Sequence, residues 1–154
     1  MAVVTEVRSP GHGVQAPRRV VACVVQHEGR LLLLKRSQEV GSDRGRWHCV
    51  TGFCDLGTEP LEQAWQELEE ETGLSRRAAY LRGRATPLEL MGGRGEVWTV
   101  HAFLFGTSDP EVTLNWEHDA ARWADGSMLD RLDTVPWLDD IHECFGSVAD
   151  VPAK

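Results

Sequence analysis

Three glutamates, at positions 67, 70 and 71, are spaced so that they could act on one ligand. At about 100° of rotation per residue, their side chains share an arc of roughly 100° on one face of a helix. Each like-charged pair at this spacing costs about 0.2–0.5 kcal/mol, and no Lys or Arg follows any of them four residues later. A bound Mg²⁺ or Mn²⁺ would remove this repulsion, because both cations prefer oxygen ligands. A solvated acidic face remains the alternative, since the spacing alone does not decide.

The helix that would carry these glutamates is predicted over residues 60–72. Pro60 suits its first turn, where the missing N–H costs nothing. Glu59 is expected at the N-cap, where its charge is favourable, and Gly73 can end the helix. Apolar residues recur at helical spacing and predict one buried stripe: Leu61, Ala64, Trp65 and Leu68.

Apolar and β-branched runs predict strands on both sides of this helix. A hairpin is expected from residues 20–26 and 31–34. Loops are expected at 37–46 and 52–58, and two short helices near the end at 126–132 and 138–148. The order of elements predicts an α/β fold, in which helices cover the faces of a mixed sheet. Further strands are expected at 47–51, 86–90, 97–105 and 120–124.

Length and charge limit the organisation and the partners of the chain. Its 154 residues suffice for one domain, and we expect a flexible arm over 1–17, the domain over 18–150 and a tail over 151–154. The net charge of −8 argues against nucleic-acid binding, but not against a small anionic substrate in a pocket with local arginines. No apolar run approaches the roughly 18 residues that span a bilayer, and the N-terminus lacks a secretory signal. We therefore expect no membrane association and a cytoplasmic location.

The four cysteines show no spacing typical of zinc sites. Cys23 and Cys49 lie in apolar runs and are expected to be buried thiols. Cys54 lies in a predicted loop, where it could be exposed, but no neighbouring residue would activate it as a nucleophile.

Residues 52–74 resemble the Nudix box of the MutT-like hydrolases, whose pattern is G-x5-E-x7-R-E-U-x-E-E-x-G-U with U a bulky aliphatic residue. The resemblance implies the Nudix α/β/α sandwich, with the box as loop, helix and loop. It also implies that Glu67, Glu70 and Glu71 bind the metal, with Glu117 as a further ligand or base. Glu89 and Glu96 compete with Glu117 for that role. Seven of the nine fixed positions match: Gly52, Glu67, Leu68, Glu70, Glu71, Gly73 and Leu74.

Two fixed positions of the box differ. Thr58 stands at the first glutamate and Gln66 at the arginine, two residues that can form an ion pair in the family. Losing both leaves no charge without a partner. We therefore expect the two differences to affect the rigidity of the loop and the rate of catalysis more than the binding of metal.

The resemblance implies metal-dependent hydrolysis of a diphosphate linkage in a nucleoside di- or triphosphate or a related derivative. Mg²⁺ or Mn²⁺ would clamp the phosphates, and Glu70, Glu71 and Glu117 are the expected catalytic carboxylates. Two alternatives stay open: a nucleotide-binding module without turnover, and isomerisation of an isoprenoid diphosphate. The substrate and a homodimeric state are also open. Candidates for substrate binding are Arg36, Arg44 and Arg46 for phosphate, and Trp98, His101 and Trp116 for a base.

Overall fold

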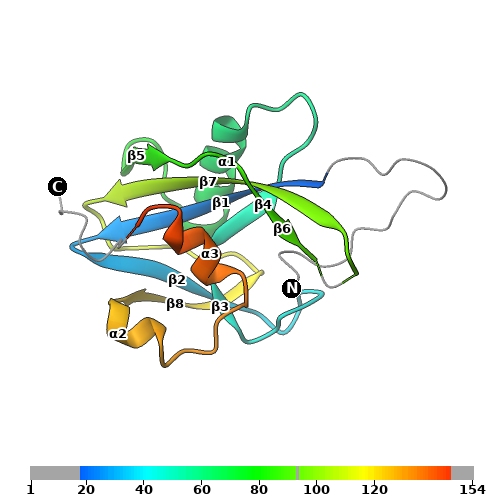
Figure 1. Ribbon diagram of the computed structural model, residues 1–154. Helices are drawn as coiled ribbons and strands as arrows, with labels where there is room; N and C mark the ends of the chain where they lie inside the picture. The colour runs from blue at the N-terminus through cyan, green and yellow to red at the C-terminus, as the bar shows by residue number, and fades with distance from the viewer. Residues whose placement is uncertain (1–17, 93, 147–154) are drawn as a thin grey trace.

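A computed structural model describes residues 18–92 and 94–146 (Figure 1). The predicted arm (1–17), the tail (151–154) and the last four residues of the predicted domain lie outside this part. The elements follow in the order β1 (Arg18–His27), β2 (Arg30–Arg36), β3 (Trp47–His48), β4 (Val50–Phe53), α1 (Pro60–Thr72), β5 (Ala79–Arg84), β6 (Leu88–Met91), β7 (Val97–Thr107), β8 (His118–Ala124), α2 (Gly126–Leu129) and α3 (Leu138–Glu143).

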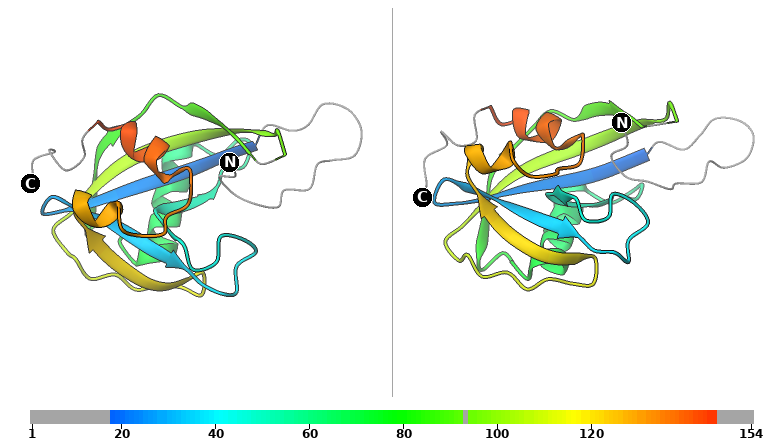
Figure 2. Two further views of the ribbon diagram at one scale, coloured as in Figure 1. Left: turned by 60° about the horizontal axis from the view of Figure 1, so that its bottom comes forward. Right: turned by 90° about the horizontal axis from the view of Figure 1, so that it is seen from below.

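Strand β1 is the centre of a mixed eight-stranded sheet. On one side it pairs in parallel with β7 along its length. On the other side its partner changes, because residues 20–23 pair with β4 and residues 26–27 pair with β2. Strands β1 and β2 therefore diverge from their shared turn (Figure 2). The divergence leaves room beside β4, where α1 begins.

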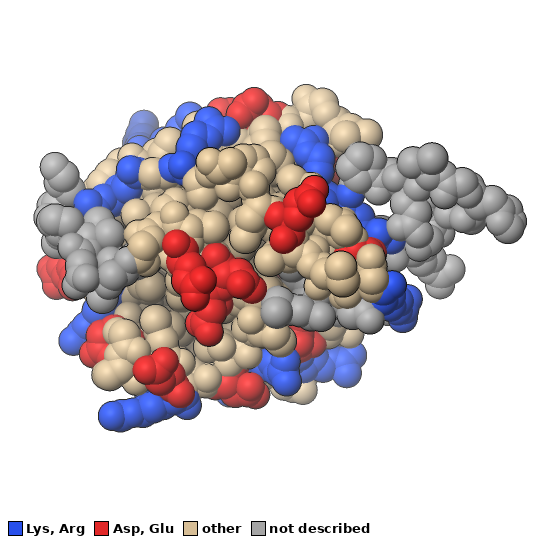
Figure 3. Space-filling view, in the orientation of Figure 1, with Lys and Arg blue, Asp and Glu red and all other residues tan. Residues whose placement is uncertain are grey.

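Helices cover both faces of the sheet, which confirms the predicted α/β/α arrangement. Alternate residues of β1 point to opposite faces, so Val20, Ala22 and Val24 pack in the core beneath α3 while Val21 and Val25 pack in the core beneath α1. Burial of each of these valine side chains contributes about 1.5–3 kcal/mol to the stability of the fold. The surface over α3 carries a cluster of acidic side chains (Figure 3).

Helix α1 has the predicted bounds, and Glu59 is its N-cap. The Glu59 side chain makes no capping hydrogen bond and instead pairs with Arg84 at 3.4 Å. Gly73 ends the helix in the left-handed region at φ 78°, which favours glycine.

Several predicted boundaries were wrong. The strand expected at 47–51 is two strands, β3 and β4, divided at Cys49, and the strand expected at 86–90 is β6 at Leu88–Met91. Helices α2 and α3 are shorter than expected within the described residues. Strand β5 was not predicted because its side chains are mostly exposed and do not alternate. Cys54, which the sequence allowed to be exposed, is buried, with 5% of its surface exposed. Cys23 and Cys49 are buried as expected. No helix of the described residues is long and apolar enough to cross a membrane.

Burial of His142 on α3 makes the stability of the fold depend on pH. Burial lowers the pKa of His142 to about 4 from an ordinary value of 6.5, although Asp139 opposes the shift. Between these values the unfolded chain binds more protons, so the free energy of unfolding decreases as the pH falls. We expect urea unfolding to show lower stability at about pH 5 than at about pH 7.5, and His142→Gln to lose less stability over this interval. Equal losses in the two proteins would contradict this role of His142.

Candidate active site

The glutamates of α1 reach a cleft of about 610 Å³ beside β4. Glu67 and Glu70 line this cleft together with Glu117, which lies just before β8. The structure therefore brings together carboxylates from two segments that are 47 residues or more apart in the sequence. The other lining residues are Arg36, Glu39, Val40, Gly41, Thr51, Gly52, Phe53, Asp55, Gln63 and Trp116.

Glu71 is the most deeply buried carboxylate of the group, with 2% of its surface exposed. The backbone N–H of Thr51 donates to it, but its Oε1 has no hydrogen-bond partner. Burial raises the pKa of Glu71 well above its ordinary value, and the neighbouring Glu117 and Glu67 raise it further. A buried acid with an unused oxygen beside two other carboxylates is suited to a cation ligand.

Glu67 is held between the helix and β4. The Nε2 of Gln63 donates to Glu67 Oε2 at 2.8 Å, one turn earlier on α1. On the other side Gly52 allows close approach, since a Cβ at this position would collide with the Glu67 carboxyl group. Burial raises the pKa of Glu67, while hydrogen bonds with Glu71 and Gln63 oppose the shift. The first glycine of the box thus leaves the space that the Glu67 carboxylate occupies.

Two buried histidines lie behind Glu71. His118 Nε2 is 3.8 Å from Glu71 Oε1 and 2.8 Å from His48 Nε2. Burial lowers the pKa of His118 to about 4 and that of His48 well below its ordinary value. Both rings are therefore neutral near pH 7, and the contact between His118 and Glu71 is not an ion pair. Neither histidine was predicted, because their partners are 70 residues apart in the sequence.

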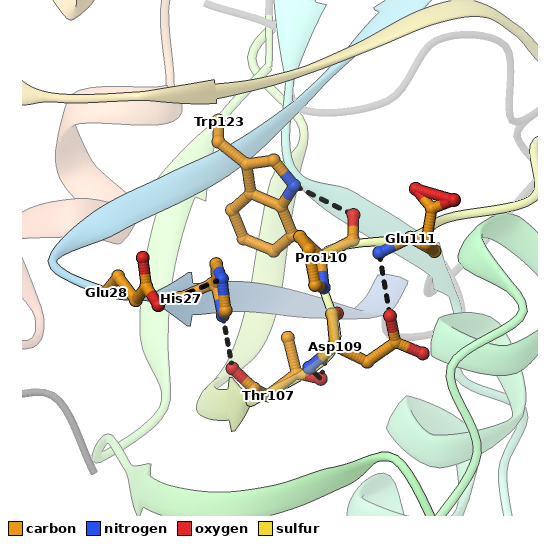
Figure 4. A network of polar contacts seen from close by, with 7 residues as sticks. All are labelled: His27, Glu28, Thr107, Asp109, Pro110, Glu111 and Trp123. Atoms are coloured by element: carbon orange, nitrogen blue, oxygen red, sulfur yellow. Dashed lines mark hydrogen bonds and ion pairs between the residues drawn. The ribbon is translucent and has the colours of Figure 1, made fainter.

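The loop between β7 and β8 is tied down at its start by a network of polar contacts (Figure 4). His27 Nδ1 lies 2.8 Å from the carbonyl oxygen of Thr107, whose hydroxyl accepts the backbone N–H of Asp109 at 3.0 Å. The indole N–H of Trp123 donates to the carbonyl oxygen of Pro110 at 3.0 Å. These bonds fix the direction in which the loop leaves the sheet.

The same loop is fixed again where it reaches the cleft. The backbone N–H of Thr113 donates to the carbonyl oxygen of Thr72 at the end of α1, at 2.8 Å. The carbonyl oxygen of Glu117 accepts the N–H of Ser37 at 2.8 Å, and Asn115 Nδ2 donates to Glu117 Oε1 at 3.2 Å. Glu117 is therefore held by Ser37, directly after β2, and by Asn115, while Thr113 joins the same loop to the end of α1.

The arginines predicted to bind phosphate separate into different places. Arg36 lines the cleft, and its Nε donates to the carbonyl oxygen of Ser42 at 2.9 Å. Burial lowers its pKa, an effect that nearby carboxylates, Asp43 first, oppose. Arg46 does not line the cleft and instead pairs with Asp43 at 3.3 Å and Asp133 at 3.6 Å. The expected contact of Arg46 with substrate is therefore not supported, because these carboxylates already hold its guanidinium.

The aromatic candidates also separate. Trp98 is 1% exposed and packs in the core beneath α3, so the expectation that it binds substrate was wrong. Trp116 lines the cleft and is 63% exposed. Phe53 was not predicted, but it too is exposed and lines the cleft. Its position directly after Gly52, at the end of a strand, was the one sequence feature that could have indicated a place in the cleft.

The donor set fits a divalent cation, although the described residues contain no group of three His, Cys, Asp or Glu side chains already close enough to hold one. The unpartnered oxygen of Glu71 and the raised pKa values of Glu71 and Glu67 both indicate carboxylates that lack a neutralising partner. Glu67, Glu70 and Glu71 of α1 would hold the cation, with Glu117 as a further ligand or base. Glu89 and Glu96, the alternatives to Glu117 as a further ligand or base, do not line this cleft.

Among the residues that the structure describes, no hydrogen bond joins Thr58 to Gln66, the two residues that differ from the box pattern. Gln66 Nε2 donates to Glu70 Oε2 at 3.1 Å, and the backbone N–H of Thr58 donates to the carbonyl oxygen of Asp55 at 3.1 Å. The box loop is held instead by the N–H of Cys54, which donates to the carbonyl oxygen of Arg19 on β1 at 2.9 Å. Backbone bonds thus brace the loop where relatives can use an ion pair.

The contact between Gly52 and Glu67 can be tested with Gly52→Ala. We expect the added methyl group to displace the Glu67 carboxylate and to raise the Mg²⁺ concentration for half-maximal rate by about tenfold. Thermal stability should change little, because the displaced atoms are the end of a flexible side chain. Gly126→Ala is the matched control, since a Cβ there meets no atom within 4 Å. An unchanged metal requirement in Gly52→Ala would contradict the proposed role of the contact.

Comparisons with known proteins agree with this geometry. The model of the NUDIX domain family matches residues 16–143. The chain is 37% identical over 128 residues to an octanoyltransferase of Myxococcus xanthus, a match that covers 75% of this chain but only 33% of that protein. It is 33% identical over 114 residues to the RNA pyrophosphohydrolase of Rhodospirillum rubrum, covering 63% of this chain and 67% of that protein.

A solved structure shares the fold. The Nudix hydrolase RenU from M. Smegmatis aligns with a TM-score of 0.70 at 19% identity, over 90% of this chain and 88% of that one. Together with the RNA pyrophosphohydrolase relative, the family match bears out the prediction of an enzyme of the pyrophosphohydrolase class. With its acidic helix, its cleft and the match over residues 16–143, the chain belongs to the Nudix family.

Proposed function

We propose that this protein hydrolyses a diphosphate linkage in a nucleoside di- or triphosphate, or a related nucleoside-diphosphate derivative, with Mg²⁺ or Mn²⁺. The observation that carries the proposal is the meeting of Glu67, Glu70 and Glu117 in one cleft, above the buried Glu71. A divalent cation bound there would neutralise phosphate charge and lower the pKa of a bound water.

Each of the residues that line or underlie the cleft has a separate role in the proposed reaction. Arg36, the arginine that lines the cleft, binds a phosphate oxygen and keeps its charge despite partial burial. Glu67, Glu70 and Glu71 bind the cation from α1. Glu117, held by Asn115, accepts the proton of the attacking water. The products are a nucleoside monophosphate, or an analogous phosphate, and the other phosphorylated half.

Exposed aromatic side chains favour a substrate that carries a base. Trp116 and Phe53 both line the cleft and offer ring faces on which a base can stack. The volume of the cleft does not single out one substrate size. We would therefore test hydrolysis of several diphosphate compounds: nucleoside triphosphates, dinucleotides, nucleotide sugars and RNA with a 5′-triphosphate. The last is included because relatives carry the name RNA pyrophosphohydrolase.

A nucleotide-binding module without turnover is the second candidate, favoured by Thr58 and Gln66 at two fixed positions of the box. Metal-dependent release of phosphorylated products separates the two candidates. Conversion of an isoprenoid diphosphate without phosphate release would instead indicate an isomerase.

Glu70→Gln tests the hydrolase. We expect kcat to fall by about 100-fold or more, because a carboxylate that binds the cation is lost while the side-chain shape is kept. Glu69→Gln, on the same helix but outside the cleft, should keep the parent rate. Product release is measured with Mg²⁺, with Mn²⁺ and with EDTA. Unchanged turnover in Glu70→Gln would remove this site from the mechanism.

Trp116→Ala tests base stacking. We expect KM for the preferred nucleoside substrate to rise about tenfold with kcat little changed, since stacking contributes about 1–3 kcal/mol per base. Inorganic tripolyphosphate, which has no base, is the control substrate and should show no change. Equal effects on both substrates would assign Trp116 a structural role instead.

A further inference from the structure

Two buried histidines meet across strand β2. His48 lies on β3, and His118 is the first residue of β8. Leu34 of β2 pairs with His48 on one edge and with Ala121 of β8 on the other, so β2 lies between the two strands. The Nε2 atoms of the two histidines nevertheless come within 2.8 Å of each other. Their side chains therefore reach over β2 and tie together two strands that do not pair with each other in the described sheet.

The contact between the two rings is a hydrogen bond between neutral side chains. Burial lowers the pKa values of both rings, so each carries a single N–H near pH 7. One Nε2 atom donates and the other accepts. Neither Nδ1 atom has a hydrogen-bond partner among the described residues. The bond between the Nε2 atoms is thus the polar contact that fixes both rings in the interior.

Backbone pairing is irregular at the position of His118. The register of β2 against β8 shifts between Lys35 and Arg36, and Asp119 is the residue left without a place in the ladder. A bulge of this kind locally disrupts the ladder and can redirect side chains. The bond from His118 to β3 therefore adds support at the point where the backbone support of β8 is weakest.

The same ring lies beside two carboxylates of the proposed active site. His118 Nε2 is 3.8 Å from Glu71 Oε1, which is too long for a hydrogen bond but close enough to limit where that oxygen can move. Glu117 directly precedes His118, and its carbonyl oxygen accepts the N–H of Ser37 at 2.8 Å. A shift of His118 would therefore move the backbone of Glu117 and change the space beside Glu71.

Neither histidine is placed to act on a substrate directly. His48 is 1% exposed and His118 is 6% exposed, and neither lines the cleft. The Nε2 atom of each ring is engaged by the other ring. Any effect of the pair on a cation in the cleft must therefore pass through Glu71 and Glu117, which makes the two histidines positioning residues.

We propose that the hydrogen bond between His48 and His118 holds Glu117 in place relative to Glu71 and thereby sets the affinity of the cleft for a divalent cation. The inference rests on the proposed function, because it concerns the cation that the glutamates of α1 are proposed to bind. Contacts that orient metal ligands from behind are worth about 10- to 100-fold in metal affinity. This bond joins residues 70 positions apart, so it acts on the site through the fold and not through the local sequence.

Mn²⁺ binding to the full chain without substrate tests the role of the bond, with free Mn²⁺ measured by electron paramagnetic resonance. Binding that Glu70→Gln removes is assigned to the cleft. We expect His48→Leu to raise the Kd for Mn²⁺ about tenfold, because leucine fills the space of the ring but cannot bond to His118. His48→Gln should keep the Kd within about twofold of the parent value, since its amide can donate or accept in place of the ring nitrogen.

Two further variants control for general effects on the fold. His142→Leu removes a buried histidine from α3, outside the cleft, and should leave the Kd for Mn²⁺ unchanged even where it lowers thermal stability. The double variant His48→Leu, His118→Leu leaves neither ring without its partner, so it keeps the test available if the single variant does not fold. Its Kd should rise about tenfold and not about 100-fold, because both substitutions remove the same bond.

The outcomes decide the inference separately from the proposed function. Unchanged Mn²⁺ affinity in His48→Leu, or an equal loss in His48→Gln or His142→Leu, would overturn the positioning role. Additive effects in the double variant would also overturn it, because each ring would then act alone. A parent that hydrolyses diphosphates while His48→Leu binds Mn²⁺ normally would refute only this inference. Weakened Mn²⁺ binding in His48→Leu, with no hydrolysis by the parent, would support the inference and refute only the hydrolase.

Discussion

The gathering of carboxylates around Glu71 is the constraint on which the rest of the site depends. Glu71 is buried beside Glu67 and Glu117, so burial and like charge both favour its neutral form. An arrangement of this kind is unfavourable by itself and persists because packing on several sides holds it. Helix α1 supplies two of the carboxylates, and a loop fixed at both ends supplies the third. A cation would turn this mutual repulsion into attraction, which is why the geometry favours phosphate chemistry.

The sheet makes the cleft possible through one change of partner on β1. If β2 paired with β1 along its whole length, no space would remain for β4 and the box loop. Because β4 takes over at residues 20–23, Gly52 comes to lie against Glu67, and the N–H of Thr51 reaches Glu71. The two cores on either side of β1 hold this divergence in place, so core packing and the site are coupled through a single strand.

The parts of the fold that follow local rules could be predicted from the sequence. Helix α1 has a proline at its start, one apolar stripe and a glycine at its end, and its bounds were predicted correctly. Long-range contacts were not predictable. Strand alternation places Val97 and Trp98 on opposite faces, but only the packing of the whole core shows that Trp98 is the buried one. Arg46 pairs with Asp133, which is distant in the sequence. The sequence alone therefore could not show that Arg46 is held away from a phosphate-binding role.

The unusual residues Thr58 and Gln66 alter the support of the site more than its chemistry. An ion pair between these positions would brace the loop with two charges, each of which requires desolvation. Here backbone hydrogen bonds from Cys54 and Thr58 hold the loop, and Gln66 is free to donate to Glu70. That amide offsets part of the repulsion between Glu70 and its acidic neighbours without adding a positive charge that would compete with a cation. The carboxylates that we propose to bind the cation therefore remain in register although the family's ion pair is absent.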